Sequence, residues 1–496
     1  MSNDIHTEVA IIGGGVQGAG IAQAAAAAGY DSCIFERATW AAGTSQRSSK
    51  LIHGGLRYLE TAQFSLVFHS LRERAQLLRN APELVRPVPF YIPIYKNTSR
   101  RPWQIRAGLT LYYLLSGGGP LGHFRKLKKE EWNNLDGLDT NGLQAVFQYW
   151  DGQTDDRLLT EAVVDSAAQL GAQTFTGWEL LEAKKNEDGY SLTFNTADGE
   201  RRCHCKSLVN ATGPWVNQTS QRIENAAMTE EIELVRGSHI VVDKRLGRGV
   251  YYMEAPSDRR AVFAMPWGEH TLVGTTEIIH RDGPDNIAPS NDEITYLQDT
   301  LSPFFPGEKP ALIDAWAGLR VLPRSDDRAN KRLRDTFLMC DDENSPKILS
   351  VYGGKITTYR KLAEHALEKL GRVLALPGKA WTANAPLPGG DMPDGDFAAF
   401  LWRISERYEW LPPEMLLRLA RAYGTRIEAV IGSAGSLGEL GAHMGGNLYE
   451  AELRYLFDAE YARTAQDVLW RRSKLGLHLP VGAQQAVADW FAAQTS

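Results

Sequence analysis

The chain is poor in cysteine, and the spacing of its cysteines excludes the common cysteine-based sites. Four occur among 496 residues, at Cys33, Cys203, Cys205 and Cys340. None forms a C-x-x-C pair, so neither a disulfide framework nor a zinc ribbon is expected. Cys203 and Cys205 flank His204, but this spacing is too tight for the usual zinc motifs, and alternation along a strand explains it better. We therefore predict no metal site.

Long apolar runs and an excess of basic residues are also lacking. No run of about 20 apolar residues is present, so the sequence predicts no membrane-spanning helix. The polar start, 1–6, has the pattern of neither a signal peptide nor a transit peptide, and we expect a cytoplasmic protein. The net charge of -6 gives no reason to expect nucleic-acid binding. A Walker P-loop, a G-x-S-x-G motif and the protein kinase motifs are absent too.

What the chain does contain is a strand, a glycine turn and a helix close to its start. The apolar run 9–12 leads into G-x-G-x-x-G at Gly13, Gly15 and Gly18. In such a turn the first glycine bends the chain, the second lets the backbone approach a pyrophosphate, and the third lets helix and strand pack closely. Glu36 ends the next strand about 20 residues on, where an acidic side chain meets a ribose hydroxyl of NAD or FAD. A plain glycine-rich turn is the alternative, which the strand–turn–helix context disfavours.

The rest of the chain mixes helices with two kinds of strand. The spacing of apolar residues predicts helices over 64–79, 155–175 and 357–370, and strand-rich stretches over 190–194, 208–213, 234–274 and 348–354. Prolines between 82 and 93 are expected to divide that stretch into short extended pieces. Strands of the nucleotide-binding type are thus separated by strands that look antiparallel, which indicates a nucleotide-binding domain interrupted by a second sheet domain. A linker at 376–393 leads to a mostly helical end.

The stretch 96–129 has an unusual charge balance. It holds eight Lys or Arg residues and no Asp or Glu, in a protein that is acidic overall. Between its basic flanks lies an apolar run that includes Trp103, Tyr112 and Leu114. One interpretation is a partly buried helix with solvated ends. The other is a basic amphipathic segment that lies on anionic lipid.

Several glycine-rich clusters contain side chains that suit an anion or a proton transfer. Paired glycines follow His53, where the backbone can pass close to a flat ring, and Arg57 supplies donors for an anion. Two glycines precede Lys355 at a helix start, which suits an anion or the polar edge of a flavin. Arg320 follows another glycine, and His239 lies between a glycine turn and an apolar run. A capped turn, a solvated lysine and a core histidine are the simpler interpretations of these residues.

Taken in order, these clusters resemble the FAD-dependent glycerol-3-phosphate dehydrogenases, and among bacterial members the aerobic respiratory enzyme most closely. The matching stretches are 8–20, 48–60, 208–215, 236–242, 273–277, 318–320, 351–364, 449–453 and 469–472. They span nearly the whole chain, and the second and the last are far more specific than the glycine fingerprint. Two positions depart from the family pattern, since Glu277 stands where Asp is more frequent and Val321 where Pro is usual. These departures concern local geometry rather than the reaction.

The resemblance implies an α/β fold of three parts. An FAD domain of the glutathione-reductase/D-amino-acid-oxidase type is expected to carry an inserted antiparallel-sheet substrate domain and a C-terminal helical cap domain. The oxidoreductase region is expected over 1–385, with the FAD domain at roughly 1–75, 150–225 and 325–385 and the substrate domain at roughly 76–149 and 226–324. The helical domain is expected over 390–496.

The resemblance also implies a reaction and its partners. sn-Glycerol 3-phosphate is oxidised at C2 to dihydroxyacetone phosphate, the hydride passes to N5 of FAD, and the electrons go on to ubiquinone or menaquinone. This activity serves glycerol and glycerophospholipid catabolism. It implies a homodimer, and the basic stretch 96–129 adds the expectation of peripheral attachment to the anionic lipid surface of the inner membrane. The alternatives are an oxidase that reduces O₂, another amine or hydroxy-acid oxidase of this fold, and a non-catalytic flavoprotein sensor.

The chemistry of that reaction singles out the site residues that we predict. A base or a strong positive field must lie beside the C2 oxygen, and we assign this role to His239 and Arg320, with His53 close to the flavin. A phosphate dianion needs cationic donors, for which the candidates are Arg57, Tyr58, Arg334 and Lys355. The predicted FAD contacts are Gly13, Gly15, Gly18, Glu36, Thr44, Ser45, Ala211, Gly213, Gly354 and Thr358.

Overall fold

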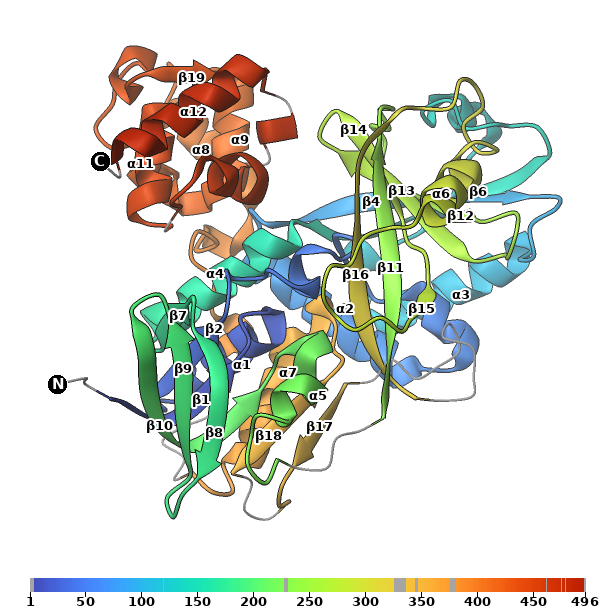
Figure 1. Cartoon of the computed structure of the whole chain (residues 1–496). Coiled ribbons are helices and arrows are strands. Elements are labelled where there is room, and N and C mark those ends of the chain that lie inside the picture. The colour runs from blue at the N-terminus through green and yellow to red at the C-terminus, as the bar shows by residue number, and fades with distance from the viewer. Residues whose placement is uncertain are drawn as a thin grey trace. The chain divides into compact units, whose positions relative to one another are not determined.

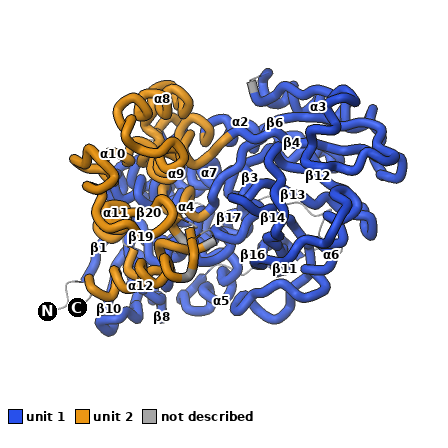
Figure 2. The backbone as a smooth tube through the Cα atoms, turned by 90° about the horizontal axis from the view of Figure 1, so that it is seen from above, with its two compact units in different colours: residues 1–76, 87–156, 163–383 blue, residues 77–86, 157–162, 384–496 orange. Residues whose placement is uncertain are grey.

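The computed structural model describes residues 4–118, 120–226, 231–324, 336–343, 347–374, 381–460, 462–473, 475–477 and 479–494. The chain forms two compact units, which Figure 2 shows in two colours. The first comprises 1–76, 87–156 and 163–383, and the second comprises 77–86, 157–162 and 384–496. The domain boundaries given above stay a prediction.

A mostly parallel sheet in the first unit carries the glycine fingerprint. Five parallel strands lie side by side in the order β18 (Ile348–Tyr352), β10 (Gly199–Asn210), β1 (Ile5–Ile12), β2 (Ser32–Glu36) and β7 (Gln173–Thr176) (Figure 1). The edge strand β17 (Phe337–Cys340) is antiparallel to β18, and the hairpin of β8 (Glu179–Lys185) and β9 (Tyr190–Thr196) pairs with β10. Val9 and Ile11 in β1 are fully buried, as is usual for a parallel strand that is covered on both faces.

Helices α1 (Val16–Ala27) and α7 (Tyr359–Leu370) pack on this sheet and against each other. A Cβ atom at Gly20 would lie 2.6 Å from Cδ2 of Tyr359, so the glycine permits the close crossing of the two helices. α7 comes more than 300 residues after α1. The ends of a long segment of chain therefore return to one fold, as the scattered strands predicted.

A second, mainly antiparallel sheet lies in the same unit. Its strands follow the order β15 (Ile278–His280), β11 (Ile232–Val242), β14 (His270–Gly274), β13 (Ala261–Trp267), β12 (Val250–Glu254), β4 (Val85–Tyr95), β6 (Leu143–Thr154) and β3 (Leu51–Ile52), while β16 (Leu312–Pro323) pairs with β11 and β5 (Arg125–Lys126) with β6. Helix α6 (Asn291–Leu301) packs on this sheet through Leu297 and Leu301. Ser290 caps α6, with its hydroxyl accepting from the Glu293 N–H at 3.3 Å.

Further helices belong to both units. α2 (Phe64–Asn80) and α3 (Pro102–Leu115) follow the first β-α-β unit, and α4 (Asp156–Gln169) and α5 (Val216–Ser220) lie later in the chain. The second unit contains α8 (Phe397–Arg407), α9 (Pro413–Tyr423), α10 (Ile427–Ile431), α11 (Glu450–Asp458), α12 (Val481–Gln494) and the short strands β19 (His443–Gly445) and β20 (Leu448–Tyr449). Among the described residues, no helix has both the length and the hydropathy that crossing a membrane requires.

Two local predictions were wrong. The helix predicted over 155–175 ends at Gln169, because Gly171 takes a left-handed φ of +108° and the chain then enters β7. The stretch predicted as short extended pieces forms one strand, β4, of 11 residues. Its prolines stand at alternate positions, Pro87, Pro89 and Pro93, so the missing N–H donors fall on one edge of the strand.

Candidate active site

One cavity of about 600 Å³ in the first unit brings most of the predicted site residues together. Its lining comes from both sheets and includes Gly13, Gly15, Glu36, Thr44, Ser45, His53, Tyr58, Ala211, Gly213, His239, Arg320, Gly354 and Lys355. Gly18, Arg57 and Thr358 do not line it, and Arg334 lies outside the described residues.

The cofactor half of the cavity is shaped by backbone that leaves no room for side chains. Gly13 has a left-handed φ of +111°, and a Cβ atom on it would lie 2.6 Å from the carbonyl oxygen of Ala211. A Cβ on Gly18 would overlap the carbonyl oxygen of Gly13, so Gly18 permits close packing of α1 on the turn. Gly15 precedes α1 in extended conformation, which leaves the N-terminus of the helix facing the cavity.

Glu36 lies at the end of β2, beside the glycine turn. Its two carboxylate oxygens accept from the Gly14 N–H at 2.8 Å and from the Ala38 N–H at 2.9 Å. These bonds hold the carboxylate at the cavity wall, and each oxygen has a second lone pair that can accept from a ribose hydroxyl. Ser45 fixes the start of α1 in a similar way, since its Oγ accepts from the Val16 N–H at 2.9 Å.

A second glycine turn closes the cofactor half. Gly354 has a φ of +105°, and a Cβ atom on it would lie 2.5 Å from Nε2 of Gln17. Gln17 donates from Nε2 to the Lys355 carbonyl at 3.3 Å, while its buried Oε1 has no partner among the described residues. Two bare glycine turns, a helix N-terminus, a carboxylate and a buried amide oxygen fit a dinucleotide with a flat polar ring. The residues present therefore fit FAD.

Arg320, which lines the substrate half of the cavity, belongs to a cluster of charged side chains around Glu277. The Glu277 carboxylate lies 2.5 Å from NH2 of Arg260, 3.2 Å from NH1 of Arg320 and 3.9 Å from NH2 of Arg57. Nearby, Nζ of Lys355 lies 4.0 Å from the centre of the Tyr58 ring. Burial, with the neighbouring Arg57 and Arg260, lowers the pKa of Arg320 to about 10. A cluster of several cations around one carboxylate favours the binding of a further anion.

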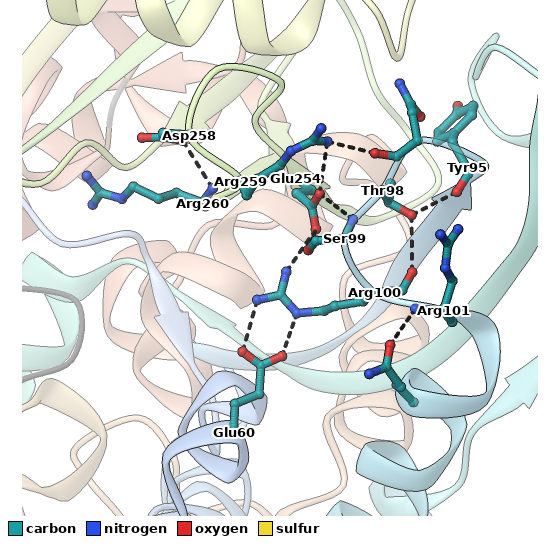
Figure 3. A network of polar contacts seen from close by, with 12 residues as sticks. Glu60, Tyr95, Thr98, Ser99, Arg100, Arg101, Glu254, Asp258, Arg259 and Arg260 are labelled. Atoms are coloured by element: carbon teal, nitrogen blue, oxygen red, sulfur yellow. Dashed lines mark hydrogen bonds and ion pairs between the residues drawn. The ribbon is translucent and has the colours of Figure 1, made fainter.

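A network next to this cluster holds its walls in place (Figure 3). Arg100 binds both oxygens of Glu60, at 2.5 and 2.9 Å, and reaches Glu254 at 3.0 Å. Glu60 belongs to the 3-10 helix Leu56–Thr61, which also carries Arg57 and Tyr58, and Glu254 ends β12. In Figure 3 the Arg260 side chain points away from Arg100 and Glu60. Its ion pair with Glu277 is not part of that view. The network thus joins two segments that supply arginines to the cluster.

His239 occupies a tightly bounded place on β11. Its Nε2 lies 3.0 Å from Oγ of Ser49, and its ring stacks on Trp316 with a centroid distance of 5.9 Å. On another side the ring lies so close to Gly274 that any Cβ atom there would overlap it. Burial, together with Arg320 and Lys50, lowers the pKa of His239 to about 3, so the imidazole is neutral at neutral pH. A neutral imidazole can accept a proton.

The remaining predicted residues lie near these two halves. His53 lines the cavity and packs edge-on against Phe263 at a centroid distance of 6.3 Å. Thr44 donates from Oγ1 to the Leu319 carbonyl at 2.8 Å, which ties the loop after β2 to β16. Val321 is buried beside Val216 and Tyr352, so the departure from Pro places an apolar side chain in a small core.

Sequence reasoning missed Arg260, Ser49 and Gln17 as members of the site. Ser49 and Gln17 lie within the motif stretches 48–60 and 8–20, so their position in these motifs could have identified them. Arg260 had no such signal, because it reaches Glu277 only through the pairing of β12 with β13. Within the described residues no group of three or more His, Cys, Asp or Glu side chains is arranged to hold a metal ion.

The chain is similar to known flavoproteins over its whole length. The family model of FAD dependent oxidoreductases matches residues 8–360, and that of the C-terminal domain of alpha-glycerophosphate oxidase matches residues 380–495. The chain is 36% identical to D-erythritol 1-phosphate dehydrogenase of Brucella abortus, over 97% of each chain. It is also 36% identical to aerobic glycerol-3-phosphate dehydrogenase of Escherichia coli, over 98% of each chain.

A solved structure of glycerol-3-phosphate dehydrogenase from Bacillus halodurans complexed with FAD superposes with a TM-score of 0.79. It is 25% identical and covers all of this chain, which in turn covers 91% of that one. These likenesses confirm the predicted fold class, with its oxidoreductase region and its separate C-terminal domain. They also confirm the predicted cofactor, for which the cavity has the appropriate cradle. The chain therefore belongs to the FAD-dependent oxidoreductases of the glycerol-3-phosphate dehydrogenase family.

Proposed function

We propose that this flavoprotein oxidises sn-glycerol 3-phosphate to dihydroxyacetone phosphate and passes the electrons to a membrane quinone. The observation that carries the proposal is that Arg320 and Lys355 line the same cavity as the FAD cradle, while two further arginines share the carboxylate that holds Arg320. Arg57, Arg260 and Arg320 converge on Glu277, and Lys355 lies beside them over Tyr58. A phosphate dianion is the substrate group that such a cluster binds best, because guanidinium groups donate paired hydrogen bonds to its oxygens.

The residues around the cluster suit the proton chemistry of the reaction. FAD, when bound, supplies the acceptor for the C2 hydride. His239 is held neutral and can take the hydroxyl proton, while Arg320 provides positive charge for the oxygen that loses it. His53 completes the cavity wall near the glycine pair. The FAD contacts predicted from the sequence are part of the same proposal.

The surface of α3 supports the quinone acceptor and the membrane attachment in this proposal. Trp103 and Leu114, near the two ends of this helix, are 70% and 65% exposed. Arg106 is exposed between them, and the basic residues at 125–129 are exposed as well, while Ile105, Leu109 and Tyr112 anchor the opposite side. Exposed apolar side chains with basic neighbours are typical of a surface that lies on anionic lipid. A peripheral position would bring the protein to a lipid-soluble quinone.

The first experiment is anaerobic reduction of the purified flavoprotein by sn-glycerol 3-phosphate, followed at the flavin absorbance band. Glycerol is the matched control without phosphate. We expect bleaching by the phosphorylated compound alone. If both fail to bleach an FAD-loaded protein, the proposal is wrong and a sensor or another oxidase activity gains support. The acceptor is then tested by comparing a soluble quinone analogue with O₂, since rapid peroxide formation would favour the oxidase.

A longer polyol phosphate is a second candidate substrate. One relative that matches over 97% of the chain is named D-erythritol 1-phosphate dehydrogenase. Both compounds present a phosphate and a neighbouring secondary hydroxyl, so the cation cluster alone does not separate them. The ratio of kcat/KM for the two substrates decides between them. Homodimer formation, also proposed from the resemblance, is measured by light scattering on the same preparation.

A further inference from the structure

A buried ion pair near His239 has no role in the proposed reaction as described. Nζ of Lys50 binds Oδ1 of Asp156 and donates to the Gln46 carbonyl at 2.6 Å. The side chains of Lys50 and Asp156 are 4% and 0% exposed. Taking two charges out of water costs several kcal/mol per ion before their attraction offsets it. Such a buried pair contributes little net stability, so an effect of the Lys50 charge on neighbouring groups is the better explanation for its presence.

The Ser49–Lys50 dipeptide contacts the surroundings of His239 in two ways. The Ser49 hydroxyl lies 3.0 Å from Nε2 of the imidazole. Nζ of Lys50 lies 5.5 Å from the centre of the Trp316 ring, on which the His239 ring stacks. Ser49 also lines the cavity. The dipeptide therefore bonds to the proton acceptor at one atom and places a fixed cation beyond its stacking partner.

The charged groups around His239 and its neighbours come from four segments. Arg320 lies on β16, with Glu277 bound to it from the end of the β14 turn. Lys50 lies before β3, with Asp156 bound to it from the start of α4. Burial is the largest cause of the lowered pKa of His239, and the two cations add to it in the same direction. Neither of the two carboxylates reverses this effect.

We propose that Ser49 and Lys50 are positioning residues for His239, with Ser49 fixing the orientation of the imidazole and Lys50 placing a fixed positive charge behind its stacking partner that opposes protonation of the ring. This inference rests on the proposed function in one respect, namely that His239 receives the C2-hydroxyl proton. In that step the substrate O–H bond breaks and an N–H bond forms on the imidazole, while the C2–H electron pair leaves as hydride. A protonated imidazole would have no lone pair to offer, and the Lys50 charge adds to burial in favouring the form that can accept the proton.

The test measures the pKa of His239 in the FAD-loaded protein without substrate. Histidine is labelled with ¹³C at Cε1, and the His239 signal is identified by its loss in His239→Asn. In the double variant Lys50→Met/Asp156→Asn, which removes both charges together, we expect the titration midpoint to rise by about one pH unit. The matched control is Arg74→Met/Asp151→Asn. It removes another buried ion pair, with 2.5 Å between NH1 and Oδ1, and should leave the midpoint unchanged.

The same variants are then compared in flavin reduction by sn-glycerol 3-phosphate. Dividing the rate of the variant by that of wild type at each pH removes the effect of substrate phosphate ionisation, because it is the same for both proteins. For Lys50→Met/Asp156→Asn this ratio should stay constant between pH 8 and pH 5 and fall only as the pH is lowered toward the new midpoint, by about tenfold per unit of midpoint shift below it. An unchanged His239 midpoint, or an equal shift in the Arg74→Met/Asp151→Asn control, overturns the role of Lys50. Failure of wild type to be reduced would instead overturn the proposed function.

Ser49 gives a second test if the ion-pair variant does not fold. Ser49→Ala should lower kcat by about tenfold with KM changed less than twofold, because only the orientation of the acceptor is lost. Ser49→Thr keeps the hydroxyl and should restore most of kcat. A rise in KM at constant kcat, or no rescue by threonine, contradicts the positioning role.

Discussion

The two halves of the cavity differ in the parts of the chain that form them. The cofactor half consists of backbone, in which Gly13, Gly18 and Gly354 matter because a Cβ atom would overlap or crowd a neighbour. The substrate half depends on side-chain charge, because Arg320, which lines it, shares the carboxylate of Glu277 with Arg57 and Arg260. One half is therefore sensitive to added volume and the other to altered charge. Substitutions that change only one of these properties separate the two halves experimentally.

The largest effect is expected from added volume in the cofactor half. Gly18→Ala places a methyl group onto the Gly13 carbonyl oxygen, and we expect FAD affinity to fall at least about a hundredfold, equivalent to about 3 kcal/mol of lost packing. Flavin content after dialysis and fluorescence titration of the apoprotein measure this loss.

Gly199→Ala is the matched control for that substitution. Gly199, unlike the helical Gly18, has a left-handed φ of +97°, but no atom lies within 4 Å of the place that a Cβ atom would take, so only backbone strain is added. Retention of FAD by Gly199→Ala and its loss by Gly18→Ala would support the role of space. Equal losses in both would show that general destabilisation is the cause.

A change of charge in the substrate half is expected to have the next largest effect. Arg320→Gln keeps the approximate size of the side chain and removes its cation, and kcat/KM for sn-glycerol 3-phosphate should fall by about 10²–10³. FAD content should stay normal, because the cofactor half is built elsewhere. Arg320→Lys restores the charge without the planar fork and should recover only part of the activity. Concurrent loss of FAD would break the separation of the two halves.

Glu277→Gln tests the role of charge further, because it removes the carboxylate that binds the three arginines. Because three guanidinium groups then lose a shared carboxylate, we expect a lower Tm without ligand and a KM reduced by about threefold to tenfold. Inorganic phosphate should raise the Tm of the variant more than that of wild type. Melting curves with and without phosphate provide the check, and a variant that gains nothing from phosphate would contradict it.

The smallest effect is expected in the pH dependence of stability. The folded pKa of His239, about 3, lies below the ordinary value of 6.5, so the unfolded chain binds the proton first as the pH falls. The neutral histidine therefore contributes stability above pH 6.5 that is lost progressively toward pH 3, by at most about 1.4 kcal/mol per pH unit. His239→Asn should lose less Tm than wild type between pH 7 and pH 5. An equal decrease in Tm in both proteins would show that other groups cause the acid sensitivity.

The same difference explains what could be predicted from the sequence. The part of the cofactor half that was predicted from local spacing is the continuous stretch from Gly13 to Glu36, where residues close in the chain are also close in the fold. Arg260 and Lys50 reach their partners through strand pairing and the packing of distant segments, which no local pattern records. The end of α4 was missed because an alanine-rich sequence continues to Gly171, and only the left-handed backbone there stops the helix. Family resemblance supplied Arg320, His239 and Lys355, whose types alone left simpler interpretations open.

The late return of the chain to its first sheet has a consequence for biosynthesis. β1 and α1 leave the ribosome first, but β18 and α7 follow more than 300 residues later. At typical rates of synthesis the interval is roughly 20 to 60 seconds, during which the alanine-rich face of α1 has no α7 to cover it. Nascent chains that stop before Ile348 should therefore not retain FAD, although they already contain the complete glycine fingerprint. Cofactor capture is thus expected only after β18 and α7 have been synthesised.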